Sequence, residues 1–356
     1  MSGKYIRLYE SGTAADGSFL LEEGNAFFFI TTADKYILNG RNLIIGGSEL
    51  ILFKELGIVT PRMETALVDD TSKVKKISSD KFAEGLSNFP FLINVSMVIA
   101  KQVSLTNRVI AENRKNLVGK EDDRRSLCVE YYKIVKDLRE ENVKRKLPWL
   151  KDIVIKYETS LVFKEGEALS RTSEPVRIMT SNVLTDKTVE YPINGIICEE
   201  GADGSEMYIL QSGMIDVLVG GKSVATISDP GTPIGEIALL IGEKRTATMK
   251  AKNTVILTRI HKNDLKDIAS KDLSVIKSIA LSLAQKHYQN VSKVHELTMK
   301  LVDKQMNTSQ DDKRKAAMKY SSITSELSSL KNDISEVQFK KNEPFLKEIA
   351  SRYNIK

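Results

Sequence analysis

The short segment 235–248 constrains this chain more than any other part of it, because it combines glycine, a carboxylate, an apolar run and a guanidinium. We expect Gly235 to end a strand, and the run from Ile237 to Ile241 to form a helical turn whose free N–H groups face an anion. Arg245 then offers a planar fork of donors for phosphate oxygens. Glu236 would be repelled by a phosphate, so we expect it to accept hydrogen bonds from a sugar hydroxyl. The segment therefore predicts a site for a small ligand that carries both a phosphate and a ribose.

The same segment resembles the phosphate-binding cassette of the cyclic nucleotide-binding domain family. In that family Gly-Glu-hydrophobic-Ala/Gly-Leu is followed by a short variable loop and then by Arg-Ser/Thr/Ala-Ala, and the pattern is present here from Gly235 to Ala247. Glycine-punctuated segments upstream, at 191–201, 203–210 and 212–217, are similar to strands of the family's eight-stranded β-roll. The resemblance covers roughly residues 186 to 290 and implies that fold there.

The resemblance implies cyclic AMP or cyclic GMP as the ligand. It also implies a set of ligand-binding residues: Gly235, Glu236, Ile237, Ala238, Arg245, Thr246, Ala247 and Tyr288. In the family, a hydroxyl at the position of Thr246 can contact the phosphate or a guanine amino group. Bacterial members with Ser or Thr there often bind cyclic AMP, so the residue is permissive, and we predict a preference for cyclic AMP. Tyr288 lies at about the family's distance for a lid that stacks on the base, and the alternative is that it packs against a neighbouring helix.

The first hundred residues contain a weaker copy of the same pattern. Three segments correspond to parts of the better copy: 22–30 with 199–210, 36–41 with 216–222, and 47–52 with the start of the cassette. Residues 75–82 also match 258–265, as a strand followed by the start of a helix. We therefore predict a second, degenerate β-roll with its own following helix in residues 1–110.

The weaker copy departs from the pattern where a ligand would bind. Glu64 precedes Thr65 at the place where Arg245 precedes Thr246, and a carboxylate there would repel a phosphate. Arg62 could reach the site from an altered loop. We expect this copy to bind no nucleotide and to be kept for its surface.

Helical periodicity accounts for most of the remaining chain. Apolar residues recur at helical spacing within 121–146, and Pro148 begins another helix toward Tyr157. Residues 161–185 mix Ser, Thr and Glu without a clear period, which predicts a loop or linker. These segments form a predicted helical connector.

One apolar face continues from Leu273 to Leu301 and predicts a long amphipathic helix. Its first part resembles the lid and dimerisation helices of the family, so the C-terminal helices are candidates for a homodimer contact. The pattern breaks at 307–312, a further helix is expected over 314–339, and a short one follows Pro344. The predicted α+β chain thus has two β-roll (jelly-roll-like) domains and two helical segments, divided as 1–110, 111–185, 186–290 and 291–356.

Composition excludes several classes of protein. The chain has 356 residues, 41% hydrophobic and 28% charged, and no run approaches the roughly 20 apolar residues of a membrane span. The start lacks the apolar core of a signal peptide, so we expect a cytoplasmic protein. Lys and Arg are interleaved with Asp and Glu, so the net charge of +6 favours a solvated surface over a nucleic-acid-binding one. Two cysteines give no disulfide framework, and the three histidines are not spaced as metal ligands.

The leading interpretation is a cytoplasmic cyclic nucleotide receptor whose ligand repositions a helical tail and so regulates a partner protein. One alternative is a scaffold in which both β-rolls act as interaction surfaces. Another is a DNA-binding regulator, although no helix-turn-helix pattern is present in the sequence. Because we recognise no Ser-His-Asp arrangement or Walker loop, we expect no enzymatic activity and no cofactor.

Overall fold

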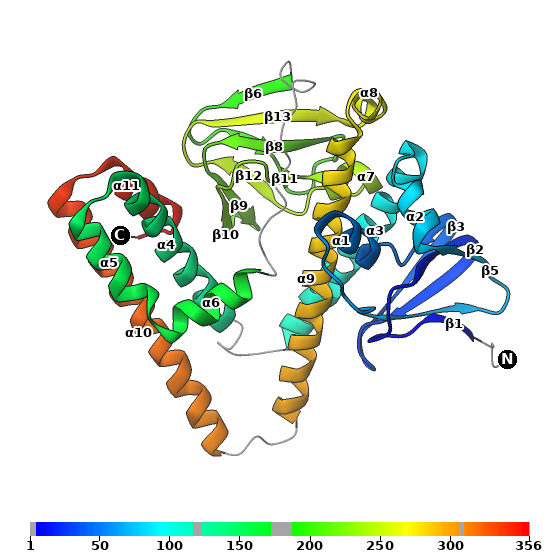
Figure 1. Ribbon diagram of the computed structural model, residues 1–356, viewed down its shortest axis with the longest axis horizontal. Helices are drawn as coiled ribbons and strands as arrows, with labels where there is room; N and C mark the ends of the chain where they lie inside the picture. Colours follow the sequence, from blue (N-terminus) through cyan, green and yellow to red (C-terminus); the bar gives the residue numbers. More distant parts are fainter. Residues whose placement is uncertain (1–4, 117–122, 172–186, 306–309, 356) are drawn as a thin grey trace. The chain divides into compact units, whose positions relative to one another are not determined.

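The computed structural model describes residues 5–116, 123–171, 187–305 and 310–355. Two compact units are present, one made of residues 1–117 and 175–301, the other of 118–174 and 302–356. The described strands belong to the first unit, and the described part of the second unit is helical (Figure 1). The predicted connector and tail segments therefore both contribute helices to the second unit.

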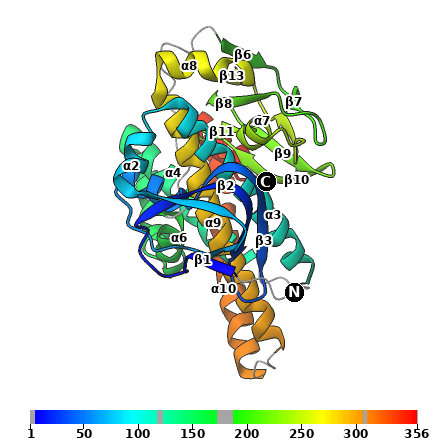
Figure 2. The same cartoon turned by 90° about the vertical axis from the view of Figure 1, so that its right-hand side faces the viewer.

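Eight strands between Thr188 and His261 form two antiparallel four-stranded sheets, ordered β10-β9-β12-β7 and β11-β8-β13-β6 (Figures 1 and 2). This is the eight-stranded β-roll that the sequence predicts for this region. The strands are β6 (Thr188–Tyr191), β7 (Ile196–Cys198), β8 (Glu206–Ser212), β9 (Ile215–Val219), β10 (Lys222–Ile227), β11 (Pro233–Ile234), β12 (Thr248–Ala251) and β13 (Val255–His261).

Strand β8 is apolar on both faces because it separates two hydrophobic clusters. Tyr208 and Leu210 point into the interior of the roll, whereas Met207 and Ile209 join the cluster formed with the helices outside it. Successive side chains of a strand alternate between faces, so a continuous Met-Tyr-Ile-Leu run is what such a position requires.

The N-terminal strands form a single antiparallel sheet of five: β1 (Tyr5–Tyr9), β2 (Gly17–Phe29), β3 (Lys35–Ile45), β4 (Thr65–Asp69) and β5 (Lys73–Ser78). The long β2 pairs with β3 over most of its length, with β5 through its first half and with β4 through its last residues. Strand β5 leads directly into α2 (Ser79–Gly85), the strand and helix start predicted there. The sheet differs from the eight-stranded roll, so a second copy of the domain stays a prediction.

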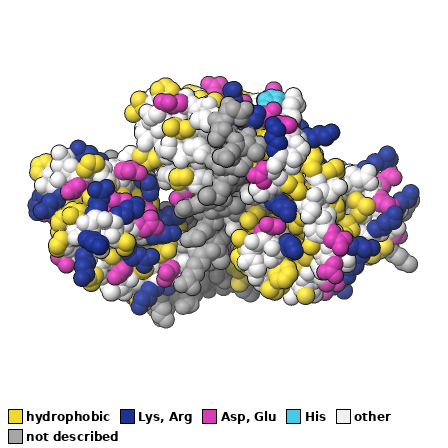
Figure 3. All heavy atoms as spheres, turned by 45° about the horizontal axis from the view of Figure 1, so that its top comes forward, with side chains coloured by type: hydrophobic (Ala, Val, Ile, Leu, Met, Phe, Trp, Pro, Cys, Tyr) yellow, Lys and Arg dark blue, Asp and Glu magenta, His cyan; other side chains and the backbone are white. Residues whose placement is uncertain are grey.

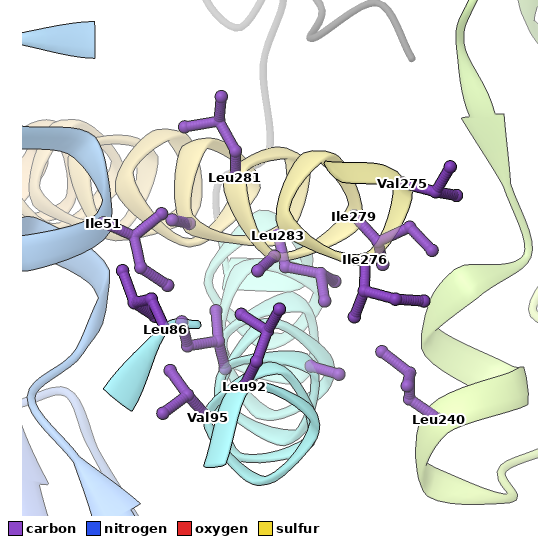
Figure 4. Packing of buried hydrophobic residues seen from close by; sticks show 14 of the residues in the cluster. Ile51, Leu86, Leu92, Val95, Leu240, Val275, Ile276, Ile279, Leu281 and Leu283 are labelled. Carbon is purple, nitrogen blue, oxygen red and sulfur yellow. The ribbon is translucent and has the colours of Figure 1, made fainter. Parts of the chain in front are cut away.

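Three helices pack together in the first unit: α3 (Phe89–Asn116), α7 (Glu236–Ile241) and α9 (Leu273–Gln305). Figure 4 shows Leu92 and Val95 of α3 facing α9, with Leu240 of α7 at one side and Ile51 of α1 (Ser48–Leu56) at the other. A turn (Lys262–Asp264) and α8 (Leu265–Lys271) connect β13 to α9. Helix α9 therefore belongs to the same core as the cassette helix α7.

Helix α3 is long and apolar enough, by length and composition, to cross a membrane, which the sequence did not lead us to expect. Within its apolar window 56% of the residues are buried inside the protein, including Val95 and Ile99 in the cluster with α9. Burial of that extent is typical of a core helix.

The second unit contains α4 (Asp123–Arg145), α5 (Pro148–Glu158), α6 (Leu161–Arg171), α10 (Gln310–Lys341) and α11 (Pro344–Arg352). The loop predicted from residue 161 was wrong as far as 171, because Val162 and Phe163 bury an apolar face against α4. Gly166 permits this packing, since a Cβ there would lie 2.1 Å from the Cys128 carbonyl oxygen. The rest of the predicted linker, 172–185, lies outside the described residues. Helix α10 begins at 310, inside the predicted break at 307–312.

Figure 3 shows Lys and Arg side chains lying among Asp and Glu side chains on the face that it draws. This distribution agrees with the interleaved charges of the sequence.

Candidate functional site

Arg245 is the centre of the candidate site, and its guanidinium is held by backbone carbonyls. Nη1 donates to the Gly235 oxygen at 3.2 Å, and Nη2 donates to the Glu206 oxygen. Arg245 is 6% exposed, and no carboxylate of the described residues forms an ion pair with it. Its Nε has no hydrogen-bond partner within the described ranges. A buried positive charge balanced only by neutral carbonyls favours an anionic ligand, because an unpaired buried charge is costly.

Gly235 is required beside this guanidinium for two reasons. Its φ of +80° lies in the left-handed region that favours glycine, and a Cβ there would lie 2.0 Å from Arg245 Nη1. Gly235 also caps the N-terminus of α7, which has six residues. The charge of Arg245, more than so short a helix, therefore makes this an anion site.

The backbone of Arg245 is fixed by the loop between β7 and β8. Gly201 N donates to the Arg245 oxygen at 2.8 Å, and Arg245 N donates to the Ala202 oxygen at 2.8 Å. Gly204 lets this loop approach α7, since a Cβ there would lie 2.3 Å from the Ala238 Cβ. The Gly-rich sequence of the loop thus positions the arginine against the start of α7.

Glu236, the residue predicted to bind the ribose, is 1% exposed and already has a partner. Lys286 of α9 donates from Nζ to Glu236 Oε1 and forms an ion pair with it. The sequence analysis missed Lys286, because it lies 50 residues away along the chain. The sequence of α9 carries no signal that distinguishes Lys286 from the other lysines of this helix.

The other predicted site residues differ in how far they are exposed to solvent. Ile237 packs against the helical core, and Ala238 and Ala247 are buried. Thr246 is exposed. Tyr288 is half-buried and packs against the hydrophobic clusters of both the helices and the N-terminal sheet, so the lid role stays a prediction beside this packing role. Gly235, Glu236 and Arg245 are thus the predicted residues whose polar groups meet around α7.

In the N-terminal sheet Arg62, and not Glu64, has a position and a glycine contact similar to those of Arg245. Arg62 stands three residues before Thr65, where β4 begins, as Arg245 stands three before Thr248, where β12 begins (65 − 62 and 248 − 245). When the two sheets are aligned on these strands, Thr65 matches Thr248, two residues beyond the Thr246 that the sequence matched with it.

The two arginines share a backbone anchor but differ in charge balance. Arg62 Nη1 donates at 2.8 Å to the oxygen of Gly46, whose φ is +73°, and also at 3.1 Å to Glu49 Oε2. The side chains of Arg62 and Glu49 are 0% and 3% exposed. Met63 N donates to Glu49 Oε1 at 3.2 Å, and the guanidinium lies 4.3 Å from the Tyr9 ring centroid. The positive charge of Arg62 is therefore satisfied internally, as that of Arg245 is not.

Glu64 belongs to a separate buried polar network that joins α9 to the N-terminal sheet. The Tyr36 hydroxyl donates to Glu64, with O–O distances of 2.8 and 2.7 Å, and Gln102 Nε2 donates to Glu64 Oε1 at 3.0 Å. On α9, His287 Nδ1 lies 2.9 Å from Ser48 Oγ, and its Nε2 lies 3.4 Å from the Tyr36 hydroxyl. Burial raises the pKa of Glu64 to about 8 and lowers that of His287 to about 3. Burial therefore favours the uncharged form of both groups.

Residues 188–272 match the family model described as the cyclic nucleotide-binding domain. This part of the chain is a cyclic nucleotide-binding domain. Cyclic nucleotide-gated channel beta-1 from Homo sapiens is 40% identical over 87 residues, which are 23% of this chain and 7% of the relative. The cAMP-dependent protein kinase regulatory subunit of Debaryomyces hansenii is 32% identical over 115 residues, which are 32% of this chain and 25% of the relative.

The match therefore spans a quarter or less of the length of these relatives. Among solved structures, the regulatory subunit of a cAMP-independent protein kinase A from Trypanosoma brucei aligns over 81% of this chain and 82% of its own, at 15% identity and a TM-score of 0.25.

Proposed function

We propose that this chain is a cyclic nucleotide receptor in which residues 188–272 bind the ligand and α9 carries the effect to the rest of the protein. The observation that supports it most strongly is the buried guanidinium of Arg245, which lacks a carboxylate partner among the described residues. A cyclic phosphate would supply the missing negative charge, and charge-assisted hydrogen bonds of this kind are the strong ones.

Glu236 would bind the ribose of the same ligand. Its carboxylate and the Arg245 guanidinium both lie at the start of α7. A ligand with hydroxyl groups on one edge and a phosphate on the other could donate to the carboxylate and accept from the guanidinium. We expect cyclic AMP to be preferred over cyclic GMP. Thr246 is exposed beside Arg245, so its hydroxyl is available to a ligand.

A regulatory role is supported by the course of the chain after the domain. Helix α9 contacts α7 and then continues into residues 302–356, which belong to the helical unit. Nucleotide would act on a protein partner by favouring one position of these helices, and it can do so only by its difference in affinity for the two positions. We propose that the chain acts in the cytoplasm as a receptor and not as an enzyme.

Calorimetric titration of the full chain tests this function. Cyclic AMP and cyclic GMP should bind with one site per chain, and AMP, which carries the open phosphate and a higher charge, serves as the control for simple anion binding. At one hundred times the dissociation constant, a cyclic nucleotide should stabilise the folded state by about 2.7 kcal/mol. Absence of binding by both cyclic nucleotides, with the chain folded, would contradict the proposal.

A further inference from the structure

The ion pair between Lys286 and Glu236 places a residue of α9 directly on the predicted ribose site. The side chain of Glu236 is 2% exposed and that of Lys286 is 37% exposed, so the ammonium lies on the solvent side of the carboxylate. A ligand that reaches Glu236 from solvent must therefore displace Lys286 or move the helix that carries it.

The neighbouring residues of α9 hold the helix against the N-terminal sheet and α3. His287, which follows Lys286, is 1% exposed and contacts Ser48 and Tyr36. Asn290, one turn later, donates from Nδ2 to Thr106 Oγ1 of α3 at 3.0 Å. One turn of α9 thus connects the cassette of the β-roll to the buried network of the other sheet.

A third contact extends this attachment further along α9. Thr298 donates from Oγ1 to Asp34 Oδ2, in the turn between β2 and β3. Asn113 of α3 donates to the other oxygen of the same carboxylate at 2.9 Å. Helix α9 is therefore bonded to the N-terminal part of the chain at Tyr36, Ser48 and Asp34. Its ion pair with the cassette helix is the one between Lys286 and Glu236, as far as the described residues show.

We propose that Lys286 competes with the ribose hydroxyl for Glu236, so that nucleotide binding releases α9 from the cassette while α9 stays bonded to the N-terminal sheet. This inference rests on the proposed function, because it concerns the regulation of the same site. Lys286 would thus act as an internal inhibitor of nucleotide binding. The N-terminal sheet would move together with α9.

The direction of the effect distinguishes this device from a lid. If Lys286 competes, its removal leaves the buried Glu236 carboxylate without its ammonium before the ligand arrives, so the ligand hydroxyl binds more tightly. If α9 instead closes over the nucleotide, loss of Lys286 leaves the affinity unchanged or weakens it. A 2'-deoxy nucleotide has no hydroxyl to exchange for Lys286, so its affinity should hardly depend on this residue.

The test is calorimetric titration of the full-length wild type, Lys286→Met and the control Lys293→Met with cyclic AMP and 2'-deoxy cyclic AMP. Lys293 lies on the same helix and forms an ion pair with Glu296 at 3.6 Å. We expect Lys286→Met to tighten cyclic AMP binding by about three- to tenfold, a change suited to a partly exposed ion pair. The affinity for the 2'-deoxy analogue should change less than about twofold, and Lys293→Met should change neither.

A second readout is amide hydrogen exchange, which reports local opening. In the wild type, cyclic AMP should raise exchange in residues 275–286, the part of α9 that packs near α7, and not in 287–298, which stays bonded to the N-terminal sheet. Lys286→Met should show raised exchange in 275–286 without ligand. Weaker or unchanged cyclic AMP binding by Lys286→Met, or an equal gain for both nucleotides, overturns the competition. Failure of the wild type to bind either nucleotide overturns the proposed function as well, and the two failures are thereby distinguished.

Discussion

The two buried arginines permit a paired prediction, because they share a backbone anchor and differ in their anions. Arg62→Met removes the partner of Glu49, and Arg245→Met removes a guanidinium that has only carbonyl partners among the described residues. Methionine retains much of the apolar stem in both cases, so the comparison isolates the charge.

The expected stability changes follow from burial of the partner. The Glu49 side chain is 3% exposed, so Arg62→Met leaves a buried carboxylate unpaired and should cost about 3 to 5 kcal/mol of unfolding free energy. Arg245→Met gives up two bonds to carbonyls but also removes an unpaired buried charge. We expect these effects to offset one another and to leave the free energy of unfolding within about 1 kcal/mol of the wild type.

Nucleotide affinity should respond in the opposite way. Loss of the Arg245 contact with the phosphate should cost about 2 to 5 kcal/mol of binding free energy, which is at least about a thirtyfold rise in Kd. Arg62→Met should leave the Kd for cyclic AMP nearly unchanged in the fraction that is folded. Lys244→Met is the control, because Lys244 is exposed and its ion pair is with the exposed Asp203.

Urea unfolding without nucleotide and calorimetric titration with cyclic AMP measure these two quantities separately. The reasoning is refuted if Arg245→Met binds cyclic AMP as tightly as the wild type, or if Arg62→Met is no less stable than Arg245→Met. The first result would remove Arg245 from the anion site. The second would mean that Glu49 does not depend on Arg62.

Three further predictions concern other polar groups. Glu236→Gln should weaken cyclic AMP by about 1.5 to 3 kcal/mol and 2'-deoxy cyclic AMP by much less, as titrations would show; equal losses would give Glu236 a purely structural role. The pKa of Glu64 is raised by burial to about 8, so the folded state keeps a proton that the unfolded chain loses, and stability should fall as pH rises toward 8. The pKa of His287 is lowered to about 3, so this group changes the stability with pH only below its usual pKa of 6.5. Of the two groups, Glu64 alone should therefore make stability depend on pH between pH 6.5 and 8. Melting temperatures of Glu64→Gln should lack the decline in that window, and a decline equal to that of the wild type would exclude Glu64 as its source. Thr246→Ala should weaken the discrimination between cyclic AMP and cyclic GMP, and an unchanged ratio of their affinities would show that this hydroxyl does not select the base.

The sequence could predict the cassette because its parts are local. Gly235, the turn of α7 and Arg245 lie within one short segment, and the bonds that join them are set by neighbouring backbone. The eight-stranded roll was likewise predictable, since glycines mark its turns and β8 must be apolar on both faces. The sequence therefore predicted the contacts between groups that are close along the chain.

Contacts distant along the chain were not predictable in the same way. Lys286 meets Glu236 only because α9 packs against α7, and no periodicity in α9 indicates which lysine faces the cassette. Arg62 was considered only as a residue that could reach the site from an altered loop, because the match of Thr65 with Thr246 placed Glu64 at the position of Arg245. Its spacing from β4 and its bond to Gly46 become visible only in the folded chain. The helix at 161–171 has an apolar face, with Val162 and Phe163 packed in the helical cluster. It was missed because 161–185 was treated as one segment, whose Ser- and Thr-containing C-terminal part has no helical period.

The most direct test of the anion site is a crystal structure of the full chain with cyclic AMP. We predict phosphate oxygens within about 2.7 to 2.9 Å of the Arg245 guanidinium nitrogens, with a ribose hydroxyl on Glu236. The account is contradicted if the nucleotide lies elsewhere while Arg245 still donates to the carbonyl oxygens of Gly235 and Glu206.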